Sequence, residues 1–285
     1  MKKTIHLNGK KLDLSQPVVM GILNVTPDSF FDGGHYLSEL KIIERIHQIA
    51  EDGAGIIDIG AYSTRPGALP VDEKEEIARL TPAVELVRKY YPRMPVSIDT
   101  FRASVAEEIN TCMGPVIVND ISGGMMDDSM FRYVTDTGIP YIMMHIQGTP
   151  QTIQKNPVYD NITKEVYDFL AERIETLNHA GFDNIIVDPG FGFGKTLAHN
   201  YELLAGLDLF NNLGYPVLVG VSRKSMICRL LEQKPADALN GTTALNTIAL
   251  LKGADILRVH DVKEAVEAVK IVSAMADGER ALNAH

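Results

Sequence analysis

Eight short runs of mostly apolar residues recur along the chain, and segments with helical hydrophobic spacing separate them. The runs cover residues 18–24, 55–60, 95–99, 115–120, 140–145, 184–189, 216–222 and 254–260. Continuous apolar runs of this length are typical of parallel strands buried on both faces. The alternation predicts an α/β fold, a single-domain (β/α)8 TIM barrel. Because alternation alone does not show that a sheet closes, a doubly wound open sheet is the competing architecture.

The segments between the runs carry their hydrophobic residues on one helical face. Val166, Leu170 and Ile174 have this spacing, which predicts a helix packed on the sheet. Asp261 followed by Glu264 matches a capping box at the start of the last helix. We interpret these apolar stripes as core positions.

A tight turn is predicted near the N-terminus. Asn8-Gly9 stands between two short alternating runs, which predicts a β-hairpin over about residues 4–14, ahead of the barrel. No linker divides the remaining chain. We therefore expect residues 1–285 to form a single domain.

The composition of the chain indicates which kinds of partner it binds and in which compartment it works. The 285 residues are 45% hydrophobic and carry a formal net charge of −10, which disfavours nucleic acid and anionic membranes as partners. Met1-Lys2-Lys3 is followed by polar residues and no apolar signal core, so a cytoplasmic protein is expected. Cys112 and Cys228 lie far apart without metal-binding spacing, which predicts buried thiols in place of a disulfide or a zinc site.

Polar side chains gather at the predicted ends of the strands. They are Asn24, Asp58, Asp99, Asn119, His145, Asp188, Ser222, Arg258 and His260. The carboxyl ends of the strands of a barrel form one face, and active sites of this architecture lie there. Any one of these residues alone is better explained as a satisfied core or rim residue, but their concentration predicts a site.

A glycine-rich loop follows one of these strands. In Asp188-Pro-Gly-Phe-Gly-Phe-Gly-Lys195, alternating glycines allow the backbone to pass close to a ligand. The Walker A pattern and the GxGxxG pattern each fail here by one residue. A glycine turn without a ligand is the alternative interpretation.

Seven motifs in order along the chain together resemble one enzyme family. They are Asn24-Val-Thr-Pro-Asp-Ser-Phe30, Ser63-Thr-Arg-Pro-Gly67, Ser97-Ile-Asp-Thr100, Asn119-Asp-Ile121, Asp188-Pro-Gly-Phe-Gly-Phe-Gly-Lys195, Ser222-Arg-Lys-Ser225 and Arg258-Val-His-Asp261. From about Val18 to Lys270 the chain resembles dihydropteroate synthase, a (β/α)8 enzyme of folate biosynthesis and the target of sulfonamides. The resemblance implies condensation of a dihydropterin diphosphate with 4-aminobenzoate, and a homodimer.

A pterin ring presents donors and acceptors along its edges and a flat apolar face. Asp188 can accept from its amino and ring NH groups, Asn119 can donate and accept, and Lys224 can donate to the ring carbonyl. The full expected pterin set is Asp99, Asn119, Met144, Asp188, Phe193, Lys224 and Arg258. Phe193 and Met144 are expected to pack on the ring.

The resemblance implies an SN1-like reaction in which diphosphate leaves before the aryl amine attacks. Arg258 and His260 are expected to bind the diphosphate, and Asn24 is the implied ligand of Mg²⁺. Asp99 would stabilise the pterin cation electrostatically. Asp99, Lys224, Arg258 and His260 are thus the expected catalytic residues.

The second substrate is expected to lie under two long loops, residues 25–37 and 61–71. Thr64, Arg65, Pro66 and Ser225 are the expected 4-aminobenzoate residues, and Asp28, Ser29, Phe30 and Asp32 are expected to close over the site. The chain departs from the family pattern in two places, at Ala61-Tyr62 and at Phe31. Arg102 and Arg223 receive no role and are expected to be solvated.

Three other functions remain open at this point. A related barrel could act as a pterin-dependent methyltransferase with a corrinoid-protein partner. Lys224 could instead form a Schiff base in an aldolase. A barrel that binds pterin without turnover is the non-enzymatic alternative.

Overall fold

The computed structural model describes residues 3–26, 35–62, 71–148 and 157–283. Eight parallel strands form its main sheet, in the order β8-β7-β6-β5-β4-β3-β10-β9. Their bounds are β3 (Val18–Asn24), β4 (Ile56–Gly60), β5 (Val96–Asp99), β6 (Ile117–Asp120), β7 (Tyr141–Met144), β8 (Ile185–Asp188), β9 (Leu218–Val219) and β10 (Ile256–Val259). Each predicted run contains one of these strands, so the strand prediction is confirmed.

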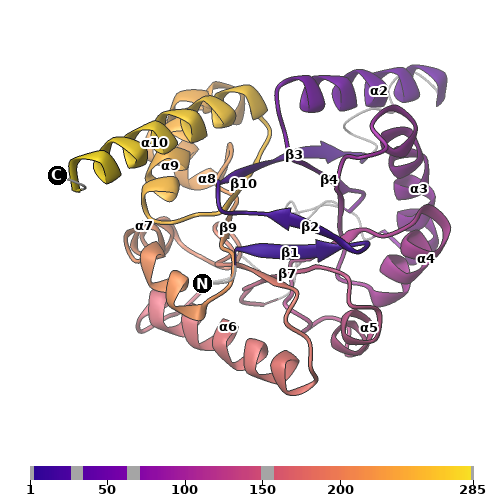
Figure 1. The fold of residues 1–285 in the computed structure, drawn as a ribbon, viewed down its shortest axis with the longest axis horizontal. Coiled ribbons are helices and arrows are strands. Elements are labelled where there is room, and N and C mark those ends of the chain that lie inside the picture. Colours follow the sequence, from indigo (N-terminus) through magenta and orange to yellow (C-terminus); the bar gives the residue numbers. More distant parts are fainter. Residues whose placement is uncertain (1–2, 27–34, 63–70, 149–156, 284–285) are drawn as a thin grey trace.

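The sheet closes between its first and last strands. Val187 of β8 forms a parallel bridge with Val217, the residue before β9. The Val187 amide donates to the Pro216 carbonyl at 2.9 Å. The eight strands therefore form a barrel (Figure 1), and the open doubly wound alternative is wrong.

Helices surround the barrel (Figure 1). They are α2 (His35–Glu51), α3 (Glu73–Tyr90), α4 (Ala103–Met113), α5 (Met130–Thr137), α6 (Ile162–His179), α7 (Leu197–Ala205), α8 (Ser225–Leu230), α9 (Leu239–Leu251) and α10 (Val262–Asn283), with 3-10 turns η1 (Leu207–Leu213) and η2 (Pro235–Asp237). Val166, Leu170 and Ile174 of α6 are buried, as their spacing predicts.

Successive residues of each strand face opposite sides of the sheet, and both sides are buried. Ile57, Val118, Val187 and Leu257 belong to the large hydrophobic cluster between the strands and the helices. Their neighbours Ile56, Ile117, Ile186 and Ile256 belong to a second cluster, together with Ile142, Met20 and Leu218. The second cluster fills the amino-terminal part of the barrel interior.

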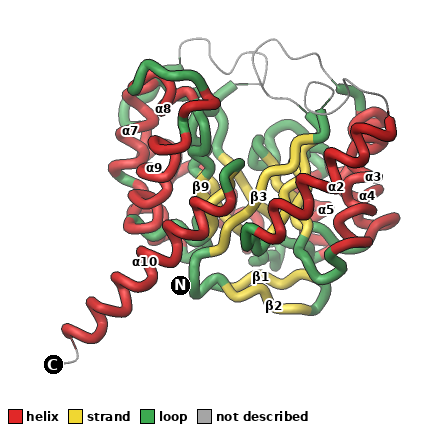
Figure 2. The backbone as a smooth tube through the Cα atoms, turned by 90° about the horizontal axis from the view of Figure 1, so that it is seen from above, coloured by secondary structure: helices red, strands yellow, loops and turns green. Residues whose placement is uncertain are grey.

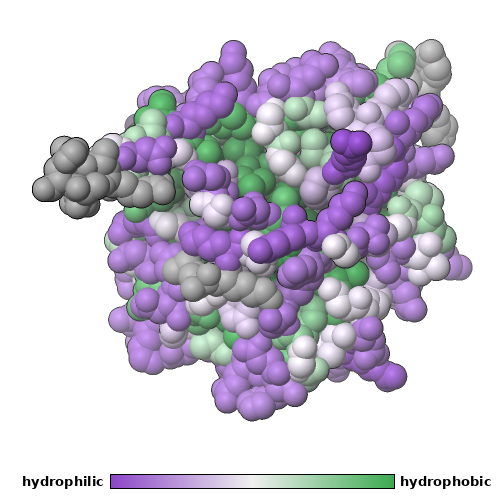
Figure 3. Space-filling model, viewed as in Figure 1, coloured by the Kyte–Doolittle hydropathy of each residue, from purple (hydrophilic) through white to green (hydrophobic). Residues whose placement is uncertain are grey.

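The predicted hairpin closes that end of the barrel. Its strands β1 (Thr4–Leu7) and β2 (Lys10–Asp13) pair antiparallel, and Figure 2 shows them at one end of the main sheet. Ile5 and Leu14 are fully buried in the interior cluster. The outer surface of this end is mostly hydrophilic (Figure 3), so ligand access is expected from the opposite end.

Two further expectations concern the cysteines and membranes. Both thiols are free, but Cys112 is exposed and Cys228 is half-buried, so the expectation of two buried thiols is wrong. Within the described parts of the chain, no helix has both the length and the apolar character that crossing a bilayer requires.

Candidate active site

The inward-facing residue of several strands changes from apolar to polar toward the carboxyl end. Four isoleucines of the interior cluster are each followed, two positions later, by a polar residue. The pairs are Ile56 and Asp58, Ile117 and Asn119, Ile186 and Asp188, and Ile256 and Arg258. Residues two apart on a strand share a face. Each polar side chain therefore lies in the barrel above the apolar layer.

Arg258 connects two carboxylates from neighbouring strands. Its Nε donates to Asp58 Oδ2 at 2.6 Å, and its terminal nitrogen donates to Asp99 Oδ2 at 2.8 Å. Asn119 Nδ2 lies 3.3 Å from each oxygen of Asp58, which is fully buried. Four side chains from β4, β5, β6 and β10 thus form one hydrogen-bonded group.

Burial and neighbouring opposite charges shift the pKa values of this group in opposite directions. Burial raises the pKa of Asp99 to about 7, with Arg258 opposing this shift and Asp58 reinforcing it. Burial disfavours the charge of Arg258, but Asp58 and Asp99 outweigh it and hold the pKa of Arg258 above its ordinary value. Arg258 is consequently a permanent cation in the site, whereas Asp99 changes charge near neutral pH.

Asn24 ends β3 beside Gly60, the last residue of β4. A methyl group at Gly60 would lie 3.2 Å from Asn24 Oδ1 and 3.8 Å from Asp99 Oδ2, so both oxygens border one small space. In the described ranges, no group of three or more His, Cys, Asp or Glu is arranged to hold a metal ion. Asn24 Oδ1 is the type of oxygen ligand that Mg²⁺ accepts, and Mg²⁺ needs only one or two protein ligands because it keeps waters and phosphate oxygens. Asp99 Oδ2 already accepts a hydrogen bond from Arg258.

The glycine loop packs against the segment that follows β7. Gly190, Gly192 and Gly194 have φ of 72°, 83° and 64°, a region that side chains disfavour. A Cβ on Gly190 would lie 2.0 Å from the His145 carbonyl oxygen, and one on Gly194 would lie 2.6 Å from that of Gln147. Close approach to the protein's own backbone therefore requires these two glycines.

Lys224 contacts this glycine loop. Its Nζ donates to the Phe191 carbonyl and lies 4.7 Å from the centre of the Phe193 ring. Burial lowers the pKa of Lys224 to about 8, with Asp188 opposing this shift. Burial likewise raises the pKa of Asp188, with Lys224 opposing it. The two groups thus favour each other's charged form.

An apolar cluster lies beside these polar groups. Met144, Ile121 and Ile146 form a small buried cluster, against which Phe101, Met126 and Phe193 pack. Asn119 and Asp188 are 4% and 6% exposed, so their polar groups are almost completely shielded from water. Buried polar groups beside an apolar surface suit a flat ring with polar edges.

His260 and Ser222 form a pair at the ends of neighbouring strands. The His260 amide donates to Ser222 Oγ at 3.1 Å, and the same Oγ lies 3.1 Å from His260 Nδ1. Burial and Arg258 lower the pKa of His260 to about 4. When the proton of the neutral ring is on Nε2, the hydroxyl donates to Nδ1 and the Nε2 proton can reach a ligand. Of the two expected diphosphate residues, only Arg258 is therefore charged at neutral pH, and it is paired with Asp58 and Asp99.

Several expected residues lie at the edge of the site or outside the described ranges. Ser225 is the first residue of α8 and is exposed. The predictions for Thr64, Arg65 and Pro66, and for Asp28, Ser29, Phe30 and Asp32, fall on residues outside the described ranges. They stay predictions from the sequence.

Two arginines expected to be solvated bind carboxylates on other elements instead. Arg102 pairs with the fully buried Glu76 and donates to the Val71 carbonyl at 2.9 Å. Arg223 has a left-handed φ of 54° and binds both carboxylate oxygens of Asp261. Asp261 thus fixes Arg223, a role that the capping-box pattern did not predict.

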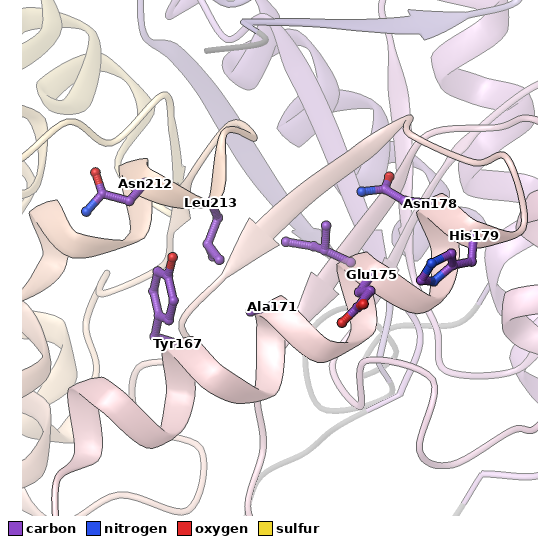
Figure 4. A pocket seen from close by; sticks show the side chains of 8 residues that line it. Tyr167, Ala171, Glu175, Asn178, His179, Asn212 and Leu213 are labelled. Carbon is purple, nitrogen blue, oxygen red and sulfur yellow. The ribbon is translucent and has the colours of Figure 1, made fainter.

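A separate hollow lies on the outside of the molecule, between α6 and η1. Tyr167, Glu175, Asn178 and His179 of α6 line it with Asn212 and Leu213 of η1 (Figure 4). Its residues come from the outer helical layer, far from the strand ends in the sequence. The buried carboxylates and cations of the barrel end have no counterpart among these lining residues, so we place the candidate site in the barrel.

Comparison with known proteins finds similarity over nearly the whole chain. A family model described as pterin binding enzyme matches residues 20–260. The dihydropteroate synthase of Escherichia coli strain K12 is 45% identical over 272 residues, which cover 95% of this chain and 95% of that protein. The Yersinia pestis dihydropteroate synthase with a sulfonamide drug has a TM-score of 0.89 at 42% identity, covering 96% of this chain and 99% of that one. The Xanthomonas albilineans synthase in complex with 7,8-dihydropteroate has a TM-score of 0.84 at 36% identity, covering 96% and 98%.

Proposed function

The chain belongs to the dihydropteroate synthase family, and we propose that it condenses (7,8-dihydropterin-6-yl)methyl diphosphate with 4-aminobenzoate, giving 7,8-dihydropteroate and diphosphate. One observation carries the proposal beyond the family: Asp188, Asn119 and Lys224 lie at the carboxyl end of the barrel, beside the apolar cluster that contains Met144 and packs against Phe193. These partners match the edges and the face of a pterin. The enzyme is thus a transferase of a pterin-methyl group.

Pterin recognition follows from the hydrogen-bonding capacity of each side chain. The Asp188 carboxylate accepts from the amino and ring NH groups, and Asn119 bonds the same edge. Lys224 donates to the ring carbonyl at the edge of the pterin, and the Phe193 ring, whose centre lies 4.7 Å from Lys224 Nζ, packs on its face. Each of these contacts is buried, so a ligand without the matching group leaves a partner unsatisfied.

The reacting bond joins the methylene carbon to a diphosphate oxygen. Arg258 and the Nε2 proton of His260 bind the diphosphate as negative charge develops on it. Asp99, 2.8 Å from Arg258, stabilises the cation left on the conjugated pterin. The aryl amine of 4-aminobenzoate then attacks the methylene carbon and loses its proton. This SN1-like sequence needs no strong general base.

Asn24 would hold Mg²⁺ together with diphosphate oxygens. A bound Mg²⁺ supplies positive charge that stabilises the leaving group. Ser225 and the sequence-predicted Thr64, Arg65 and Pro66 bind 4-aminobenzoate, and Asp28, Ser29, Phe30 and Asp32 close over it.

Three wider features belong to the same proposal. Residues 1–285 act as one pterin-binding domain, since the family match spans residues 20–260. The enzyme works in the cytoplasm, which two free cysteines support because reducing compartments keep thiols reduced. A homodimer is proposed from the family resemblance, and sedimentation of the purified protein tests it.

The reaction is tested by product analysis. Purified protein with dihydropterin diphosphate, 4-aminobenzoate and Mg²⁺ is expected to form dihydropteroate and diphosphate in equal amounts, and omission of either substrate should stop product formation. Methyl transfer to a corrinoid, or pterin binding without any product, would replace the proposed reaction by one of the alternatives. A borohydride-trapped adduct on Lys224 would favour the aldolase.

A further inference from the structure

Lys195, the last residue of the glycine-loop motif, has no part in the reaction described above. It is only 9% exposed, which is unusual for a lysine. Its Nζ lies 2.8 Å from the Gly190 carbonyl oxygen, 3.0 Å from that of Phe193 and 3.0 Å from His145 Nδ1. An ammonium group has three protons and no lone pair, so three acceptors satisfy it.

His145 is suited to accept from this ammonium group. Burial and the charge of Lys195 lower the pKa of His145 to about 2, so its ring is neutral at working pH. The ring is fixed edge-on against Phe169, with 4.8 Å between the ring centres. Burial lowers the pKa of Lys195 well below its ordinary value, but Asp188 opposes the shift and three acceptors around Nζ favour the protonated form. Lys195 therefore joins the glycine loop to the end of β7 at a fixed point.

The same loop forms one side of the proposed pterin pocket. Lys195 holds its carbonyl groups at Gly190 and Phe193, while Lys224 holds the carbonyl group of Phe191 from the pocket side. At Gly192 a Cβ would lie 3.2 Å from Lys224 Cδ, so loop and lysine are in close contact. Any movement of the loop would displace the Phe193 ring and the anchor of Lys224 together.

We propose that Lys195 is a positioning residue for pterin binding: its buried ammonium group fixes the glycine loop so that Phe193 and Lys224 are placed for the ring before it arrives. This inference rests on the proposed function. In it, Lys195 is a second lysine that binds the loop, in addition to Lys224, and it contacts no substrate. The loop is prepared in the free protein, so binding does not have to supply the cost of ordering it.

The test compares Lys195→Met with the wild type. Methionine keeps much of the side-chain length but leaves two carbonyl groups and His145 Nδ1 without their donor. We expect the Kd for 6-hydroxymethyl-7,8-dihydropterin and the KM for the dihydropterin diphosphate to rise about tenfold or more, which corresponds to about 1.4 kcal/mol. At saturating pterin, kcat and the KM for 4-aminobenzoate should stay within about threefold.

A purely structural role gives a different pattern. Loss of folded protein lowers kcat through the active fraction and leaves the KM for the pterin unchanged. The matched control is Lys164→Met, which removes a 70% exposed lysine of α6 and should bind pterin as the wild type does. Equal pterin affinity in Lys195→Met and Lys164→Met would overturn the proposal.

Two further measurements keep the outcome decisive. If Lys195→Met does not fold, Lys195→Gln, which retains an amide donor, is measured in the same way and should show the same split between KM and kcat. A double-mutant cycle with Phe193→Ala should give a combined loss smaller than the sum, since Lys195 acts through that ring. Additive losses in the cycle would contradict the proposal. If the wild type binds pterin but makes no dihydropteroate, the proposed reaction fails, and the binding comparison still decides the role of Lys195.

Discussion

Replacing Arg258 by lysine separates the two hydrogen bonds that this residue makes. The guanidinium reaches Asp58 Oδ2 at 2.6 Å and Asp99 Oδ2 at 2.8 Å at once. An ammonium group is a point charge and does not reproduce this fork. The Asp58 side chain is fully buried and that of Asp99 is 18% exposed. The lysine should therefore stay with Asp58, while Asp99 turns to water.

The magnitude follows from what each substitution leaves unpaired. Arg258→Lys loses one hydrogen bond between charged groups, which costs about 1.5–3 kcal/mol of unfolding free energy. Arg258→Met leaves two carboxylates without their cation, and the loss should reach about 3–5 kcal/mol. The lysine variant should thus lie between the wild type and the methionine variant.

Urea unfolding followed by circular dichroism at pH 8 measures these differences. Arg132→Lys is the control, because Arg132 is 86% exposed, lies 3.5 Å from Asp136 and should be replaceable without a measurable change. A lysine variant as stable as the wild type would show that the bridge between Asp58 and Asp99 contributes nothing. A lysine variant as unstable as Arg258→Met would refute the idea that one carboxylate can turn to water.

Three other predictions address binding, charge and backbone. Asp188→Ala and Lys224→Ala should each weaken pterin binding by about 1–3 kcal/mol while the circular dichroism spectrum stays unchanged, which calorimetry measures; normal affinity in both would remove these residues from the site. Asp99→Asn should lower kcat about 10²–10³-fold. Because burial raises the pKa of Asp99 in the free protein to about 7, wild-type kcat/KM should rise between pH 6 and 8 as the carboxylate forms, and this rise should be absent in the variant. The same shift means that Asp99 contributes stability at acidic pH that is lost as pH rises from about 4 to 7, so unfolding free energy should fall less over this range in Asp99→Asn. Gly190→Ala would bring Cβ to 2.0 Å from the His145 carbonyl oxygen, so it should destabilise the fold in urea unfolding more than Gly138→Ala, where no atom lies within 4 Å; equal losses would show that the loop moves freely.

The strands could be predicted because each is buried on both faces and so appears as a short, mostly apolar run. The polar residue at the end of each run followed from the same pattern, as with Asp58 after Ile56 and Ile57. The hydrogen-bond partners of these polar residues were harder to predict. Asp58 and Arg258 are 200 positions apart, and only the closed barrel brings them together.

The contacts of charged residues outside the strands could not be predicted from the sequence. Arg102 and Arg223 were expected in solvent, since the helix and turn that carry them give no sign of a buried carboxylate on another element. Lys195 and Lys224 both follow strand ends, yet the sequence does not show that Lys195 turns into the protein while Lys224 borders the pocket. Left-handed turns set the directions of the two side chains, and these turns are held by contacts with elements that are distant in the sequence.

A crystal structure with 6-hydroxymethyl-7,8-dihydropterin tests the central claim most directly. We predict that the ring lies at the carboxyl end of the barrel, with its amino and ring NH groups on Asp188, its carbonyl on Lys224 and its face against Phe193. The reaction assigned to this protein depends on that arrangement. A pterin bound elsewhere, for example in the outer hollow between α6 and η1, with the barrel end free of it, would contradict the account.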